Sequence, residues 1–188
     1  MRLAIADPPY LGRGHRWYGG GGGSSPRWPA TDNHPEARIW DAPDAHVALV
    51  QRLVADYDGW AIALSADSLA LYLSACPPGV RVGVWWKRNT MPSGARVHNR
   101  WEPVIFFIPA DRRSREVEGF LETTDVLDAP KLNTGFVGAK PPAWTRWVLA
   151  VLGHSPEDSV DDIFNGSGAV SRAIDGLLPI PTSQDVAP

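Results

Sequence analysis

Apolar residues form two patterns along the chain, short continuous runs and longer stretches with helical spacing. The first run, Leu3 to Ala6, stops at two prolines, which cannot donate to a sheet ladder, and this predicts a buried strand ending at residue 6. Further runs predict strands at 60–64, 80–86, 103–108 and 160–164, with 103–108 closing a hairpin-like excursion from 80–86. Helical spacing predicts helices over 44–57, 68–74, 141–152 and 169–177. Strands that alternate with helices predict an α/β fold with a mostly parallel sheet.

Local signals mark the ends of two of these helices. Asp44 is available as a cap at the start of 44–57, and Gly153 follows 141–152 as a stop signal. The start of the first of these helices and the end of the second are therefore marked in the sequence.

Three stretches lack a regular pattern. Residues 11–43 include five consecutive glycines and predict a mobile loop, in which Trp17, Trp28 and Trp40 either clamp a ligand or pack the loop onto the body. Residues 109–139 are charged and turn-rich, and are either a substrate-facing insertion or a surface loop. Residues 179–188 predict a disordered tail. Since 188 residues suffice for one core but not for two comfortable ones, we expect a single domain over 1–178.

The charge distribution is uneven. A net charge of −3 excludes a protein that coats nucleic acid through bulk positive charge. Residues 80–115, however, hold eight Lys or Arg against two acids, which predicts either a local nucleic-acid contact or a solvated basic face. The residues that we expect to contact phosphate are Lys87, Arg88, Arg96, Arg100, Arg112 and Arg113.

Other compositional signals exclude several classes of site. Cys76 is the only cysteine, so an internal disulfide and a cysteine-based zinc site are excluded and a cytoplasmic location is expected. No apolar stretch approaches the roughly 18 residues of a membrane span, so no membrane partner is expected. The five histidines are scattered without metal-ligand spacing, and we expect no metal.

Asp7-Pro8-Pro9-Tyr10 directly follows the first strand, and ligands of open α/β sheets bind outside the carboxyl ends of strands. An exocyclic amino group of adenine or cytosine is a weak nucleophile, because its lone pair is delocalised into the ring. The Asp7 carboxylate and the Pro8 carbonyl can each accept one amino hydrogen, and the prolines hold that carbonyl rigidly. Tyr10 offers a face on which an extruded base can stack. A turn with no catalytic role is the alternative.

Gly166-Ser167-Gly168 lies between the last predicted strand and the last predicted helix. Its two glycines let the backbone approach a ligand at a helix N-terminus, where free N–H groups attract a carboxylate. A tight turn without a ligand is the alternative.

In this order the segments resemble the amino-methyltransferases of DNA, which modify adenine N6 or cytosine N4 and carry an Asp/Asn/Ser-Pro-Pro-Tyr/Phe motif. Residues 160–168 look like the cofactor loop of that family, Gly138–Pro141 like its Lys-Pro segment, and 84–105 like its strand–loop–strand region. The catalytic motif comes first and the cofactor loop last, which is similar to the permuted "beta" arrangement.

The resemblance implies a Rossmann-like S-adenosylmethionine-dependent methyltransferase fold. The implied reaction is methyl transfer to adenine N6 in double-stranded DNA with the base flipped out; cytosine N4, an RNA target and a catalytically silent nucleic-acid-binding subunit remain alternatives. The implied catalytic residues are Asp7, Pro8, Pro9 and Tyr10. The implied cofactor residues are Asp162, Phe164, Asn165, Gly166, Ser167 and Gly168, with Lys140 and Pro141 at the methionine end.

The chain departs from the family pattern after the cofactor helix. No further strand ending in a ribose-binding acid is visible, so we expect the fold to be truncated there. The 160–164 strand would then lie at a sheet edge. Because bare edges invite pairing, we expect a homodimer or a protein partner that covers it.

Overall fold

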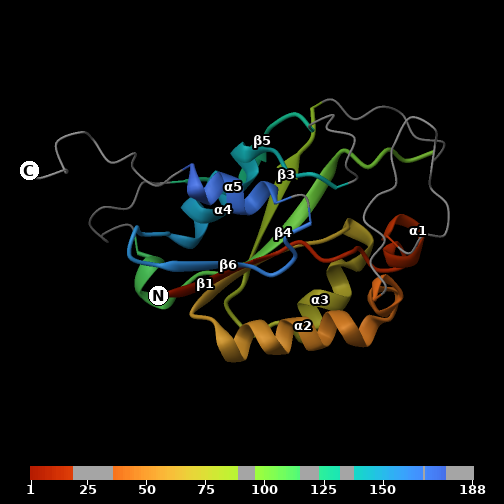
Figure 1. The fold of residues 1–188 in the computed structure, drawn as a ribbon, viewed down its shortest axis with the longest axis horizontal. Helices are drawn as coiled ribbons and strands as arrows, with labels where there is room; N and C mark the ends of the chain where they lie inside the picture. The colour runs from red at the N-terminus through yellow and green to blue at the C-terminus, as the bar shows by residue number, and fades with distance from the viewer. Residues whose placement is uncertain (19–35, 89–95, 115–122, 132–137, 167, 177–188) are drawn as a thin grey trace, which may run out of the picture.

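The structure is a computed structural model that describes residues 1–18, 36–88, 96–114, 123–131, 138–166 and 168–176. Six strands form one sheet in the order β5-β3-β4-β2-β1-β6 (Figure 1). Within these strands only β4 runs antiparallel to its neighbours, so the sheet is mostly parallel, as predicted. The strands are β1 (Arg2–Ala6), β2 (Gly59–Ala63), β3 (Arg81–Trp86), β4 (Trp101–Phe107), β5 (Val126–Asp128) and β6 (Ser159–Asp162).

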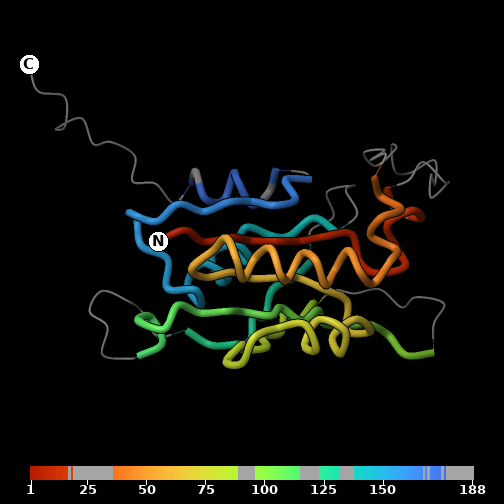
Figure 2. Tube along the Cα trace, turned by 90° about the horizontal axis from the view of Figure 1, so that it is seen from below, coloured from red at the N-terminus to blue at the C-terminus, as the bar shows by residue number. Residues whose placement is uncertain are grey.

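Helices cover both faces of the sheet (Figures 1 and 2). One face carries α2 (Pro43–Asp56) and α3 (Leu69–Ala75), and the other carries α4 (Pro142–Leu152) and α5 (Ala169–Asp175). The remaining helical segments are α1 (Gly14–Tyr18) and the 3-10 turns η1 (Ala37–Asp41), η2 (Ala66–Ser68) and η3 (Ala110–Arg112).

The core lies in two layers on either side of the sheet. Successive strand residues point to opposite faces, so Leu3 and Ile5 pack toward α4 and α5 while Ala4 and Ala6 pack toward α2 and α3. All four side chains are fully buried. A strand covered on both faces accounts for the continuous apolar run at the start of the sequence.

Most of the predicted elements are confirmed, with ends displaced by one or two residues. The stop at Gly153 is also confirmed, because this residue adopts a left-handed conformation with φ 67°. Asp44 was wrongly predicted as a cap: the N-cap of α2 is Ala42, and Asp44 lies in the first turn, where its charge still favours the helix dipole.

Two stretches predicted to lack regular structure contain elements. β5 lies within 109–139 and pairs in parallel with β3. It has only three residues, at the outer edge of the sheet, which is too short for an apolar pattern to mark it. The predicted loop 11–43 contains α1 and η1.

β6 is the other edge of the described sheet and pairs with β1 alone, as expected. The predicted tail and the chain after Gly176 lie outside the described residues. Within the described ranges, no helix is both long and apolar enough to cross a bilayer.

Candidate active site

Four charged side chains from distant parts of the sequence meet at the carboxyl edge of the parallel strands. Asp7 follows the end of β1 and Lys87 follows the end of β3. Glu102 is the second residue of β4, whose antiparallel direction brings its start to the same edge. Lys140 lies two residues before α4.

Side-chain alternation places these groups on the α4 face. Asp7 follows the parity of Ile5, and Lys87 follows that of Trp85, both of which are core residues of that face. Glu102 is directly opposite Trp85 in the β3–β4 ladder. The fold therefore gathers the four charges between the sheet and the start of α4.

The four side chains form a charge-balanced cluster of two ammonium groups and two carboxylates. Lys140 Nζ donates to Asp7 Oδ1 at 2.9 Å and lies 3.4 Å from Glu102 Oε2. Lys87 Nζ donates to Glu102 Oε1 at 2.8 Å. The Lys140 side chain is only 3% exposed, whereas Asp7 is 22% exposed. Pairing is what allows these charges to be buried.

Tyr10 is held by the same cluster. Its hydroxyl donates to Glu102 Oε2 at 2.8 Å and accepts a hydrogen bond from Lys140 Nζ at 3.2 Å. The Lys140 ammonium also lies 5.5–5.8 Å from the ring centroids of Tyr10, Trp85 and Trp144, within range of cation–π attraction. These contacts fix the orientation of the Tyr10 ring.

The cluster separates the protonation behaviour of its members. Burial raises the pKa of Asp7 to about 6, although Lys140 opposes this shift. Burial also acts to raise the pKa of Glu102, but Lys140 and Lys87 outweigh it and bring that pKa to about 2. Burial lowers the pKa of Lys140, and Asp7, Tyr10 and Glu102 raise it well above its ordinary value. Asp7 is therefore the member of the cluster that titrates near neutral pH.

The turn between β6 and α5 lies beside the cluster. Ile5 is paired with Asp162 across β1 and β6, and Ile163 N–H donates to the Ile5 carbonyl at 3.0 Å. Gly166 and Gly168 have φ angles of 36° and 69°, in the left-handed region that glycine adopts without strain. The turn therefore reaches the edge at which Asp7 lies.

Asp162 is incompletely satisfied. Its Oδ2 accepts a hydrogen bond from Ser171 Oγ at 3.3 Å, while its Oδ1 is buried and has no hydrogen-bond partner among the described residues. Burial raises the pKa of this carboxyl group. A buried carboxylate oxygen without a donor can accept a hydrogen bond from a bound ligand. Asn165 Oδ1 lies at the same distance from Ser171 Oγ, so the one hydroxyl hydrogen is shared between two acceptors.

Phe164 is supported from behind by an aromatic group. Its ring meets Trp40 edge-on at 4.9 Å, and Trp40 meets the buried His46 in the same way at 5.4 Å. Of the two interpretations of the loop tryptophans, the structure supports packing for Trp40. Trp28, Ser167 and the side chain of Trp17 lie outside the described part of the chain.

Lys140 contacts the motif at the end of β1. The family resemblance implied a place at the methionine end of a cofactor, but Lys140 bonds to Asp7 and Tyr10 of the catalytic motif. Pro141, the N-cap of α4, is buried next to it. Lys140 therefore belongs with the residues that we expect to face a base.

The six predicted phosphate contacts do not form one surface. Arg88 binds Asp128 through two hydrogen bonds at the surface, Arg100 lies 5.3 Å over the Trp86 ring, and Arg96 is exposed. Arg88 follows Lys87 directly, and the Arg100 carbonyl accepts a hydrogen bond from the Lys87 N–H at 2.8 Å, so these two lie beside the cluster at the carboxyl edge. Lys87 must be removed from the set, because it is buried against Glu102.

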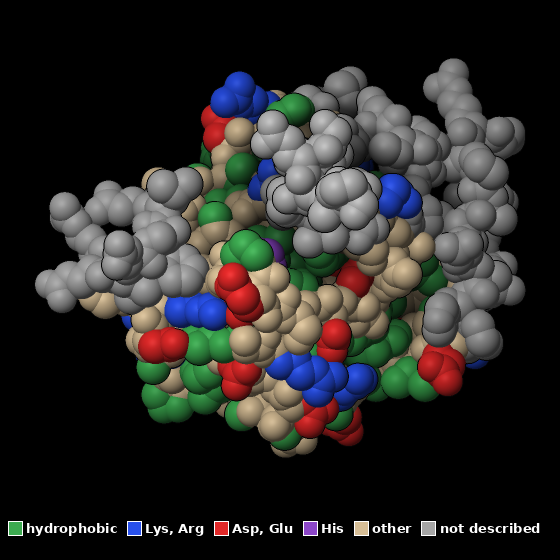
Figure 3. All heavy atoms as spheres, turned by 60° about the vertical axis from the view of Figure 1, so that its left-hand side comes forward, with side chains coloured by type: hydrophobic (Ala, Val, Ile, Leu, Met, Phe, Trp, Pro, Cys, Tyr) green, Lys and Arg blue, Asp and Glu red, His purple; other side chains and the backbone are tan. Residues whose placement is uncertain are grey.

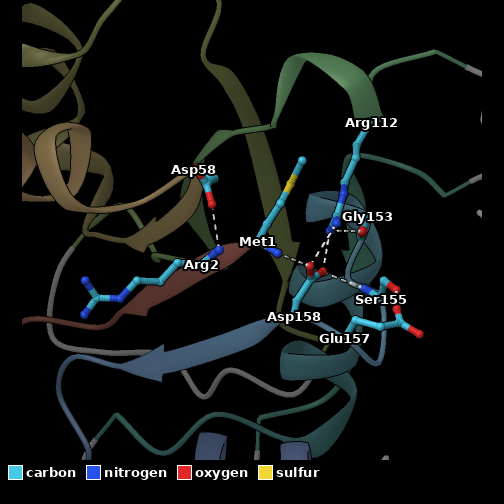
Figure 4. Close-up of polar contacts among 8 residues, drawn as sticks. All are labelled: Met1, Arg2, Asp58, Arg112, Gly153, Ser155, Glu157 and Asp158. Atoms are coloured by element: carbon cyan, nitrogen blue, oxygen red, sulfur yellow. Dashed lines mark hydrogen bonds and ion pairs between the residues drawn. The ribbon is translucent and has the colours of Figure 1, made fainter.

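Arg112 and Arg113 lie beyond the end of β4, at the amino edge of the parallel strands and away from the cluster. Arg112 binds Asp158 and the Gly153 carbonyl (Figure 4), and Arg113 donates to the Ile108 carbonyl at 2.8 Å. On the face at the left of Figure 1, acidic and basic side chains are interspersed (Figure 3). The phosphate prediction is kept for Arg88, Arg96 and Arg100.

Glu102 is the site residue that the sequence prediction missed. A signal was present, because Glu102 shares strand parity with the buried Val104 and Phe106. A charged residue on the core-facing side of a strand is rare unless it is paired. No group of three or more His, Cys, Asp or Glu suited to a metal ion occurs in the described ranges.

Comparisons with known proteins identify the fold. No family model matches the chain, and no curated protein matches it. Among solved structures, the M1.HpyAVI–SAM complex matches with a TM-score of 0.53 and 16% sequence identity, over 93% of this chain and 78% of that one. The chain has the Rossmann-like methyltransferase fold. The fold-class prediction is thereby confirmed.

Proposed function

We propose that this protein transfers a methyl group from S-adenosylmethionine to the exocyclic amino group of a base in DNA, with adenine N6 as the preferred target. One observation carries the proposal. Asp7 and Tyr10, from the motif at the end of β1, are held by one ammonium group, Lys140, beside the glycine turn that follows β6. A base bound at the motif and a cofactor bound at the turn would thus lie at the ends of adjacent strands, as the proposed reaction requires.

The base-side residues can orient an amino group and stack its ring. Asp7 is partly exposed, and the ionised carboxylate can accept one amino hydrogen, while the Pro8 carbonyl accepts the other. The clamped Tyr10 ring provides a rigid stacking face, as an extruded base requires. As the new N–C bond forms and the S–C bond breaks, the nitrogen loses one proton, which Asp7 can accept and pass to water because its pKa is raised to about 6.

The residues of the β6–α5 turn fit the cofactor. When bound, S-adenosylmethionine supplies an electrophilic methyl group on a cationic sulfonium. The Oδ1 atom of Asp162, which has no partner among the described residues, can accept a hydrogen bond from a ligand ammonium or hydroxyl group. Gly166 and Gly168 let the backbone turn without strain at two positions, and Phe164, supported by Trp40, presents an apolar surface.

Arg88, Arg96 and Arg100 provide the proposed contacts to the DNA backbone. Arg88 and Arg100 lie at the same edge as Asp7, so phosphate binding there would bring a duplex to the base-side motif. The net charge of −3 means that this attraction is local. A homodimer or partner at the β6 edge stays a prediction, which sedimentation of the active protein tests.

The test is transfer of tritiated methyl groups to unmethylated DNA, followed by nucleoside analysis. We expect label in N6-methyladenine, and its loss in Asp7→Ala. Label in N4-methylcytosine or in RNA would redirect the target, and transfer that survives Asp7→Ala contradicts the mechanism. Calorimetric titration with S-adenosylmethionine is the companion measurement, since absence of heat with well-folded protein would favour the catalytically silent subunit.

A further inference from the structure

Lys87 and Glu102 form an ion pair in which Glu102, and not Lys87, contacts the base-side motif. Lys87 Nζ donates to Glu102 Oε1 at 2.8 Å, and both side chains are largely buried. The other oxygen of Glu102 accepts the Tyr10 hydroxyl and faces Lys140. Lys87 therefore reaches Tyr10 and Asp7 through Glu102.

We propose that Lys87 and Glu102 are a buried positioning pair for this site. Glu102 holds the Tyr10 hydroxyl and shares Lys140 with Asp7, and Lys87 keeps Glu102 ionised and in place. The proposal deepens the function given above and rests on it for the identity of the reaction. Neither residue needs to touch the base.

The charge balance of the cluster supports this role. Lys140 is closer to Asp7, at 2.9 Å, than to Glu102, at 3.4 Å, so one ammonium is divided between two carboxylates. If Glu102 were neutral, Lys140 would serve Asp7 alone and hold it more firmly as an anion. If Lys87 were neutral, Glu102 would compete more strongly for Lys140, and Asp7 would be harder to ionise.

Neutralising Lys87 alone and neutralising Glu102 alone are thus expected to shift the pKa of Asp7 in opposite directions. Neutralising both restores the charge balance of the cluster. This opposition distinguishes a charge pair from two unrelated structural residues. The ionisable groups that act on Asp7 in the structure are Lys140, Glu102, Asp162, Tyr10, Tyr18 and Tyr72. All of them are retained, except Glu102, in the variants below.

The experiment measures the pKa of Asp7 by carboxyl carbon NMR in the ligand-free protein, with the signal assigned through Asp7→Asn. We expect Lys87→Met to raise the pKa of Asp7 and Glu102→Gln to lower it, each by about 1 pH unit, and the double variant to return close to the wild-type value. Arg81→Met is the matched control, because it removes a cation paired with Asp125 at the protein surface.

Shifts of the same sign in both single variants, or a Lys87→Met variant with an unchanged Asp7 pKa, would overturn the proposal. If a single variant fails to fold, the double variant Lys87→Met/Glu102→Gln is used, because it leaves the charge of the cluster balanced. Recovery of folding in the double variant supports the pair. A double variant as unstable as the worse single variant contradicts it. The NMR measurement needs no turnover, so it can be interpreted even if the wild type transfers no methyl group.

In active protein the acid limb of the kcat profile should move with the NMR pKa, while KM for DNA stays within about twofold. A Lys87→Met variant that instead raises KM for DNA, weakens the salt dependence of binding and leaves the acid limb unchanged would restore Lys87 as a phosphate contact.

Discussion

Buried carboxylates lie at both edges of the parallel strands, in very different surroundings. At the amino edge, Asp158 is 1% exposed and is bound by Arg112, by the Met1 amino group and by the Ser155 backbone N–H (Figure 4). Although burial opposes it, these partners lower the pKa of Asp158. At the carboxyl edge, Asp7 has Lys140 as its cation, and burial raises its pKa to about 6.

The two carboxylates differ in how many hydrogen bonds the protein gives them and in how exposed they are. Asp158 has its bonding capacity filled by the protein, so it joins the start of β1, η3 and the start of β6 and has little left to offer a ligand. Asp7 is less satisfied and more exposed, and its charge is poised to change near neutral pH. Such a group costs stability and is what a proton-handling site needs.

The largest expected effect is on stability at the amino edge. Asp158→Ala leaves Arg112 buried without its carboxylate, and breaking a buried pair in this way costs about 3–5 kcal/mol. Denaturant unfolding measures the loss of stability. The control is Asp111→Ala, which removes an exposed carboxylate next to Arg112 in η3. A loss below about 1 kcal/mol would remove the structural role assigned to Asp158.

The matching substitution at the carboxyl edge should affect activity instead. Asp7→Ala removes both the acceptor for the amino hydrogen and the titrating group, so we expect methyl transfer to fall by about 100-fold or more. The free energy of unfolding should change by less than about 1 kcal/mol, because Lys140 keeps Glu102 as a partner and the charge removed is one that burial disfavours. A variant that loses both activity and folding would erase the contrast between the edges.

Activity and stability should fail at different pH values. Since Asp7 acts as a carboxylate with a pKa of about 6, turnover should decline as pH falls through about 6. Glu102 and Asp158 have lowered pKa values, so their stabilisation is present above their ordinary values of 4.5 and 3.8 and is lost as pH falls toward their folded-state values, about 2 for Glu102. Parallel pH profiles of rate and unfolding check this order, which simultaneous loss near pH 6 would contradict.

The smallest effect concerns DNA binding. Arg100→Ala should weaken binding a few-fold and reduce the salt slope by about 1, because one phosphate contact is lost. Arg113→Ala, at the amino edge, should leave both unchanged. Filter-binding titrations at several salt concentrations make the comparison. Equal effects of the two substitutions would mean that DNA reaches both edges.

The elements that the sequence predicted well are those in which local pattern and burial agree. Leu3 to Ala6 is apolar throughout and is covered on both faces, so the run alone identified β1. The helices 44–57 and 141–152 were found because one apolar face recurs over several turns. β5 was missed because three residues at a sheet edge carry no such pattern, and its position depends on pairing with β3.

The candidate site also contains residues that the sequence predicted and residues whose contacts it did not predict. Asp7-Pro8-Pro9-Tyr10 could be read from the chain, because adjacent residues carry the motif and the strand before it fixes its place. The sequence predicts Lys87 as a phosphate contact and gives Glu102 no role, although both are buried partners in one cluster. Lys140 was assigned to the cofactor side from its neighbour Pro141, and its contacts place it with Asp7.

The sequence by itself determined the α/β class, the strand after which the catalytic motif falls, and the glycine turn, because each is encoded within a few consecutive residues. Only the tertiary structure decided which charges meet. β4 runs antiparallel and so brings Glu102 to the carboxyl edge and carries Arg112 and Arg113 to the amino edge. Strand direction and the register between strands, which no local window contains, thus separate a titratable site from a structural one.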